Sequence, residues 1–92
     1  MSLDVSLGDI VRAGDMIHCN VRIDGHSYDV SVSSGDAEIL APGADLADLI
    51  GESFRFLLER EPPDSILSRF DLTVIGDYFP EYRRDIASRL LH

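Results

Sequence analysis

The sequence predicts an α+β fold, in which a small antiparallel β-meander of three to four strands packs against helices. A two-residue turn motif flanked by alternating apolar residues marks the first half, residues 1–41, as β-rich. The second half, residues 42–92, carries most of the large apolar residues, and prolines divide it into short helical pieces. No stretch is long enough to serve as a linker, so we expect a single domain, residues 1–92.

Asp24 and Gly25 favour a type I′ turn between strands at residues 16–23 and 26–33. A two-residue loop determines the register of the hairpin. One face then carries the mostly apolar pairs Ile23 with His26, Val21 with Tyr28, Cys19 with Val30, and Ile17 with Val32. The opposite face carries Arg22 with Ser27, Asn20 with Asp29, His18 with Ser31, and Met16 with Ser33. We expect the first face to be buried and the second to be solvated.

The first 14 residues fit two structures. Leu3, Val5 and Leu7 alternate as in a strand, whereas Ser6 and Asp9 resemble a capping box that opens a short helix. We favour the strand, and the sequence does not decide whether residues 1–3 are native.

Ser34 and Gly35 suggest a second turn. A strand at residues 36–40 would then place Ala37 and Ile39 on the apolar face. This strand would complete the predicted meander.

A helix is expected from about Asp45 to Arg60, with acidic residues near its N-terminus, where they complement the helix dipole. Its apolar residues span roughly 200°, which is wider than a helix packed on one side needs. We therefore expect this helix to contact the sheet on one side and, on another, either the C-terminal helices or a second subunit.

Prolines and one aspartate delimit the remaining elements. Pro62 and Pro63 end the long helix and lead into a short turn at residues 64–70. Asp71 is a suitable N-cap for a helix at residues 72–78, and Pro80 begins a last helix that runs to Leu90.

The run from Phe56 through Pro62, with Ser65-Ile66-Leu67, Phe70-Asp71-Leu72, Val74-Ile75 and residues 78–82, resembles short bacterial proteins that have no assigned function. The resemblance covers about a third of the chain. It implies a bacterial source but no activity, cofactor or site.

The chain carries a net charge of -9, with 17 acidic residues spread along it, which disfavours nucleic acids and anionic membranes as partners. Its eight cationic residues are all arginines, so Schiff-base chemistry and a P-loop lysine are excluded. Without a signal segment or an apolar run of about 18 residues, the sequence predicts neither secretion nor a membrane span. A single cysteine, Cys19, fits a reducing cytoplasm.

Candidate catalytic and metal-binding groups are sparse. His18, Asp29 and Ser31 share one face of the hairpin, but an open sheet face offers no oxyanion hole and no cleft. Cys19 points to the opposite face from His18, so the two cannot act as a dyad. The histidines are too dispersed to form a metal site, and no glycine motif for a nucleotide is present, so we predict no catalytic residues, metal or cofactor.

The better candidates are the aromatic residues around Pro80, because interfaces favour tyrosine, and the apolar residues of the wide helix, which could contact a second subunit. The predicted interface comprises Phe54, Phe56, Leu58, Tyr78, Phe79 and Tyr82. Core packing is the alternative explanation for the same residues.

The leading hypothesis is a non-enzymatic cytoplasmic interaction or regulatory module that contacts another protein or itself, as a homodimer. A second is an acidic, antitoxin-like or nucleic-acid-mimicking antagonist of a basic protein. A third is a small enzyme whose site forms between subunits from His18, Asp29 and Ser31.

Overall fold

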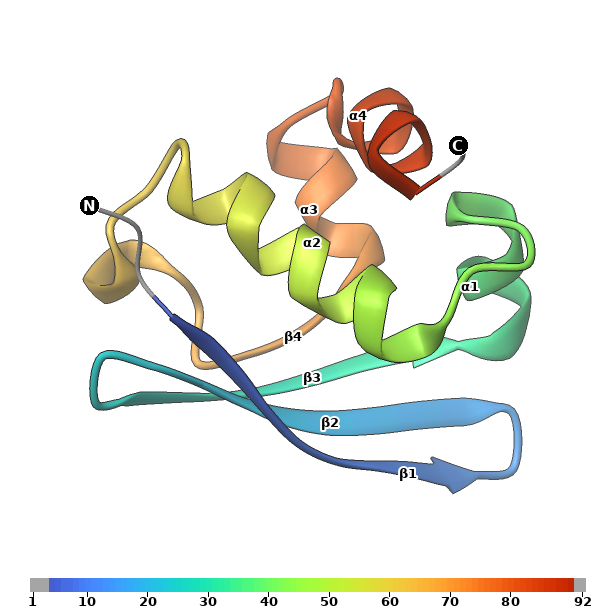
Figure 1. Cartoon of the computed structure of the whole chain (residues 1–92), viewed down its shortest axis with the longest axis horizontal. Helices are drawn as coiled ribbons and strands as arrows, with labels where there is room; N and C mark the ends of the chain where they lie inside the picture. The colour runs from blue at the N-terminus through green and yellow to red at the C-terminus, as the bar shows by residue number, and fades with distance from the viewer. Residues whose placement is uncertain (1–3, 91–92) are drawn as a thin grey trace.

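A four-stranded sheet lies beneath a layer of helices in the computed structural model, which describes residues 4–90 (Figure 1). The strand order is β1-β2-β3-β4, so the first three strands form a meander and β4 is an edge strand. The elements in chain order are β1 (Val5–Ala13), β2 (Met16–Ile23), β3 (His26–Ser33), α1 (Ser34–Leu40), α2 (Leu46–Leu58), the 3₁₀ turn η1 (Pro63–Ser65), β4 (Arg69–Asp71), α3 (Thr73–Tyr78) and α4 (Tyr82–Leu90). The predicted α+β class is confirmed, and the sheet is mixed because β4 pairs in parallel with β3.

The β2–β3 hairpin has the predicted register at all eight pairs, from Met16 with Ser33 to Ile23 with His26. Asp24 and Gly25 both have positive φ, at 48° and 83°, as a type I′ turn requires. The predicted inner face is buried beneath the helices, except for His26 at the turn, which is partly exposed.

The predicted first strand is confirmed as β1, which pairs antiparallel with β2. Its register shifts between Leu7 and Ile10, where a β-bulge places one more residue on β1 than on β2. Leu7 and Ile10 therefore both pack on the core, and Val11 is turned outward. Simple alternation could not show this shift, and the question about residues 1–3 lies outside the described residues.

The predicted strand at residues 36–40 is wrong, because this segment is helix α1. The Ser33 hydroxyl accepts a hydrogen bond from the Asp36 amide at 3.0 Å, which caps the helix and satisfies one of its free N–H groups. Ala37 and Leu40, three residues apart, lie on the same face of the helix and are buried. Ile39 was expected on the apolar face of the sheet but is 71% exposed.

The predicted turn at residues 64–70 holds two elements, η1 and the short strand β4. β4 lies beside β3, with Asp29, Val30 and Ser31 opposite Arg69, Phe70 and Asp71. Three residues are too few for a strand pattern, so β4 was not predicted.

Helix α2 packs on two sides within its own chain, which accounts for its wide apolar surface. Toward the sheet, Phe54 lies between the rings of Tyr28 and Phe70, with centroid distances of 5.4 Å and 5.8 Å. Toward the C-terminal helices, Phe56 contacts the rings of Tyr82 at 5.3 Å and Phe79 at 6.0 Å. The expected contact with the chain's own C-terminal helices is therefore present.

Asp71 caps α3 much as predicted. Its Oδ1 accepts hydrogen bonds from the Thr73 amide at 3.0 Å and the Thr73 hydroxyl at 2.8 Å. The final helix α4 begins at Tyr82, two residues after Pro80.

We expect Asp71→Ala to lower the free energy of unfolding by about 1 kcal/mol, because the cap is lost. Urea denaturation followed by circular dichroism measures this change. Asp71→Asn should restore most of the loss, and Asp77→Ala, an exposed change on the same helix, should have little effect. Equal stability of Asp71→Ala and the wild type would show that the cap does not stabilise α3.

Candidate protein-docking groove

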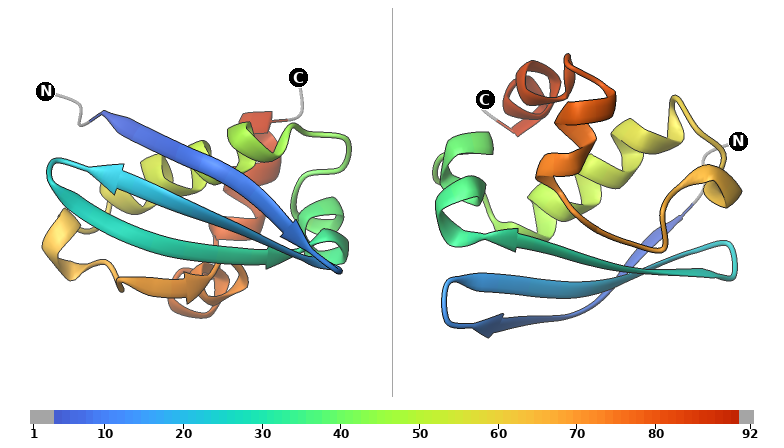
Figure 2. Two further views of the ribbon diagram at one scale, coloured as in Figure 1. Left: turned by 90° about the horizontal axis from the view of Figure 1, so that it is seen from below. Right: turned by 180° about the vertical axis from the view of Figure 1, so that it is seen from behind.

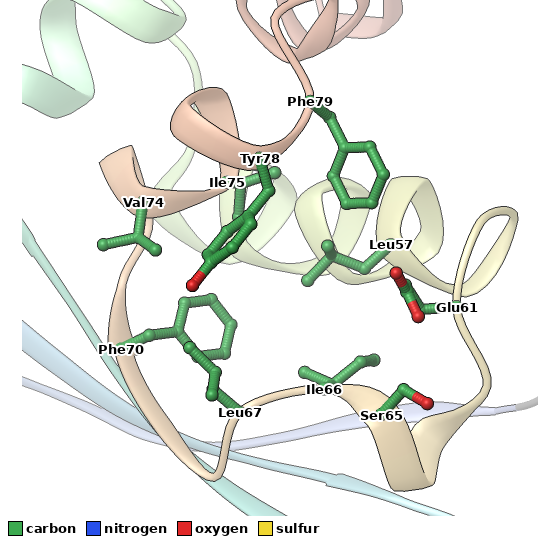
Figure 3. Close-up of a pocket in the computed structure, with 10 residues that line it drawn as sticks. All are labelled: Leu57, Glu61, Ser65, Ile66, Leu67, Phe70, Val74, Ile75, Tyr78 and Phe79. Atoms are coloured by element: carbon green, nitrogen blue, oxygen red, sulfur yellow. The ribbon is translucent and has the colours of Figure 1, made fainter.

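A groove of about 330 Å³ opens between the end of α2, the η1 loop, β4 and α3 (Figure 3). Most of its lining is apolar and comes from Leu57, Ile66, Leu67, Phe70, Val74, Ile75 and Phe79. Glu61, Ser65 and Tyr78 complete it. The groove offers an apolar side chain a place to be buried and contains few polar groups to orient a reaction.

The wall formed by η1 is held against the β2–β3 hairpin by two contacts. Proline at positions 62 and 63 turns the chain away from α2. The Tyr28 hydroxyl donates to the Pro63 carbonyl at 2.6 Å, and His26 Nε2 lies 2.9 Å from Asp64 Oδ1. Burial, followed by the negative charge of Asp64, raises the pKa of Tyr28, so this phenol stays protonated and able to donate.

The rim of the groove is partly open to solvent. Tyr78 is 68% exposed and Leu67 is 51% exposed, and both line the groove (Figure 3). The carboxylate of Glu61 lies on the other side of the groove. No arginine or histidine in residues 4–90 forms an ion pair with Glu61. The mouth thus combines apolar side chains with one unpaired negative charge.

The predicted interface residues separate into two groups. Phe54, Phe56 and Tyr82 have no exposed surface and belong to the core, as the alternative explanation held. Leu58 is partly buried and packs against that core. Tyr78 and Phe79 line the groove, so they alone of the six residues contribute to it.

Sequence reasoning missed the other apolar residues of the groove, notably Ile66, Leu67 and Phe70. They lie in a segment that was predicted to be a turn. The available signal was the presence of three large apolar residues in such a short segment between prolines and a cap, which is unusual for a solvated turn.

The arginines near the groove are engaged in joining α2 to α4. The Arg60 guanidinium lies 3.7 Å from the centre of the Phe56 ring and pairs with Glu59, Glu81 and Asp85. Arg89 donates to both carboxylate oxygens of Glu59, at 2.7 Å and 2.8 Å. The hydrogen bond from Arg89 is the main cause that lowers the pKa of Glu59. These contacts give both arginines a structural role.

His18, Asp29 and Ser31 lie on the sheet face that points away from the helices, in the predicted register. No hydrogen bond joins any two of them within residues 4–90. The Ser31 hydroxyl instead donates to Asp71 Oδ2 at 3.4 Å, and Asp29 accepts from Asn20 at 3.0 Å. The three residues line one hollow on this face of the sheet, but the Ser31 and Asp29 side chains each bond to a residue outside the predicted set.

Cys19 is buried, as predicted, and burial raises the pKa of its thiol, which keeps it in the unreactive protonated form. In the described part of the chain, no three His, Cys, Asp or Glu side chains are grouped to hold a metal ion. Among helices in that part, none has the length and apolar character needed to cross a membrane.

No protein-family model, curated protein or solved structure matches this sequence.

Proposed function

We propose that this protein is a non-enzymatic interaction module that binds a partner protein in the groove between α2, η1, β4 and α3. The partner inserts an apolar side chain and carries basic residues beside it. The observation that carries the proposal is the apolar lining, which remains reachable from solvent at Leu67 and Tyr78. Burying such a side chain contributes about 1.5–3 kcal/mol, and a tyrosine at the mouth is typical of energetically important contacts.

Charge favours a basic partner over a second copy of this chain. Each copy carries a net charge of -9, so two copies repel one another as they approach. The same charge steers a cationic partner toward the groove, where Glu61 pairs with no cation of residues 4–90. This chemistry also fits the acidic-antagonist hypothesis, which differs only in what the binding accomplishes. A cytoplasmic setting suits the module, because its lone cysteine is a free thiol.

The probe for this proposal is a library of random twelve-residue peptides displayed on phage and selected for binding to the wild-type protein. We expect enriched peptides to share an aromatic or aliphatic anchor next to arginine or lysine. Leu67→Arg should weaken their binding at least tenfold, because it removes an apolar contact and repels cations. The matched control is Ile39→Arg, which makes the same charge change at an exposed site on α1 and should leave binding within twofold of wild type.

Glu61→Gln should weaken binding two- to fivefold and reduce its dependence on salt. Failure to enrich any peptide that distinguishes wild type from Leu67→Arg would overturn the proposal. Light scattering that shows a dimer for the wild type and a monomer for Leu67→Arg would also overturn it, because a second copy would then occupy the groove.

A further inference from the structure

The outer edge of β4 carries main-chain groups that have no strand to pair with. Ser68 accepts from the Asp29 amide at 2.8 Å and Leu72 donates to the Ser31 carbonyl at 2.9 Å, so these two residues face β3. Main-chain groups alternate in direction along a strand, so the amides of Arg69 and Asp71 and the carbonyl of Arg69 point away from β3. Within residues 4–90 no strand lies beyond β4, which forms one edge of the sheet (Figure 2, left).

This edge adjoins the groove. Phe70, at the centre of β4, points its side chain into the groove, as Figure 3 shows. Arg69 points to the opposite face of the sheet, where its side chain is 84% exposed and lies 3.7 Å from Asp29. A segment laid along β4 would therefore present alternate side chains to the groove and to Arg69.

We propose that the partner docks as an added, extended strand on the outer edge of β4, with its anchor side chain in the groove. This inference rests on the proposed function and specifies the partner's conformation and pattern. In the partner strand, the side chains that face the helices are the apolar anchor and a basic residue near Glu61. The residue between them faces Arg69 and is polar or acidic. Hydrogen bonds to the strand edge would supply affinity, and the groove would supply specificity.

The other sheet edge, β1, is longer but less suited to this role. Its bulge between Leu7 and Ile10 interrupts regular pairing. A bulge is one feature by which proteins prevent strand addition. A helical partner would also fill the groove of β4, but its main chain would already be paired and would leave the β4 edge unsatisfied.

Amide hydrogen exchange followed by NMR tests the inference, with the tightest peptide from the phage selection as the probe. Saturating peptide should slow exchange of the Arg69 and Asp71 amides at least tenfold. The Phe70 amide, which faces β3, is the internal control and should change much less. Methylation of peptide amide nitrogens should weaken binding tenfold or more at alternate positions only.

The outcomes separate the two proposals. If the peptide binds in a manner sensitive to Leu67→Arg but the Arg69 and Asp71 amides exchange as in the free protein, strand addition is overturned and the proposed function stands. A methylation profile without the two-residue period would likewise overturn strand addition. If no peptide distinguishes wild type from Leu67→Arg, both proposals fail.

Discussion

Replacing Phe56 with alanine is expected to lower the free energy of unfolding by about 3–5 kcal/mol. Phe56 has no exposed surface, and its ring contacts those of Tyr82 and Phe79, so truncation leaves a cavity at the junction of α2 and α4. The change also removes the ring beneath the Arg60 guanidinium. Domains of this size have a total stability of about 5–15 kcal/mol, so this single loss is a large fraction of it. Urea denaturation followed by far-ultraviolet circular dichroism measures the effect.

Ile39→Ala is the control, because Ile39 is 71% exposed and its truncation should cost less than about 0.5 kcal/mol. If Phe56→Ala does not fold, Phe56→Leu should still lose about 1 kcal/mol, since it shortens the same contacts. A loss below about 1 kcal/mol for Phe56→Ala would contradict the assignment of this residue to the core.

Alkaline solution is expected to destabilise the protein through Tyr82. Burial raises the pKa of Tyr82 to about 12, partly offset by the hydrogen bond with Ser53 and reinforced by the charge of Asp71. The unfolded chain releases this proton near pH 10, so the folded state binds more protons between pH 10 and 12. The stabilisation is therefore complete below pH 10 and is lost as the pH rises toward 12, by up to about 3 kcal/mol.

The measurement is the free energy of unfolding from urea titrations at several pH values between 8 and 12. Tyr82→Phe should be about 1 kcal/mol less stable at pH 8, because the hydrogen bond to Ser53 is lost, and should fall less steeply above pH 10. Tyr78→Phe, at an exposed position, should retain the wild-type slope. The raised pKa values of Tyr28 and Cys19 act in the same direction, so some slope remains in Tyr82→Phe. Identical slopes for wild type and Tyr82→Phe would refute the role of Tyr82.

The candidate groove illustrates how far sequence reasoning reached. Tyr78 and Phe79 were selected because they flank a proline break, and both line the groove. Tyr82 was selected by the same reasoning, and Phe54 and Phe56 were selected because they lie on the wide apolar helix, yet all three lie in the core. An aromatic side chain has the same apolar character in both places. Whether the side chain lies in the core or in the groove depends on which other helices and strands cover it. The residues next to it in the sequence do not indicate this.

Features that depend only on residues close together in the sequence could be predicted from the sequence by itself. The Asp24 and Gly25 turn determined the hairpin register, Asp71 marked the start of α3, and the prolines marked the breaks, because each involves hydrogen bonds or steric limits within a few residues. The tertiary structure alone decided that residues 69–71 pair with β3 and that a groove opens beside them. These outcomes depend on contacts between residues as far as 40 positions apart, such as Ser31 with Asp71, and only packing of the whole chain selects among them.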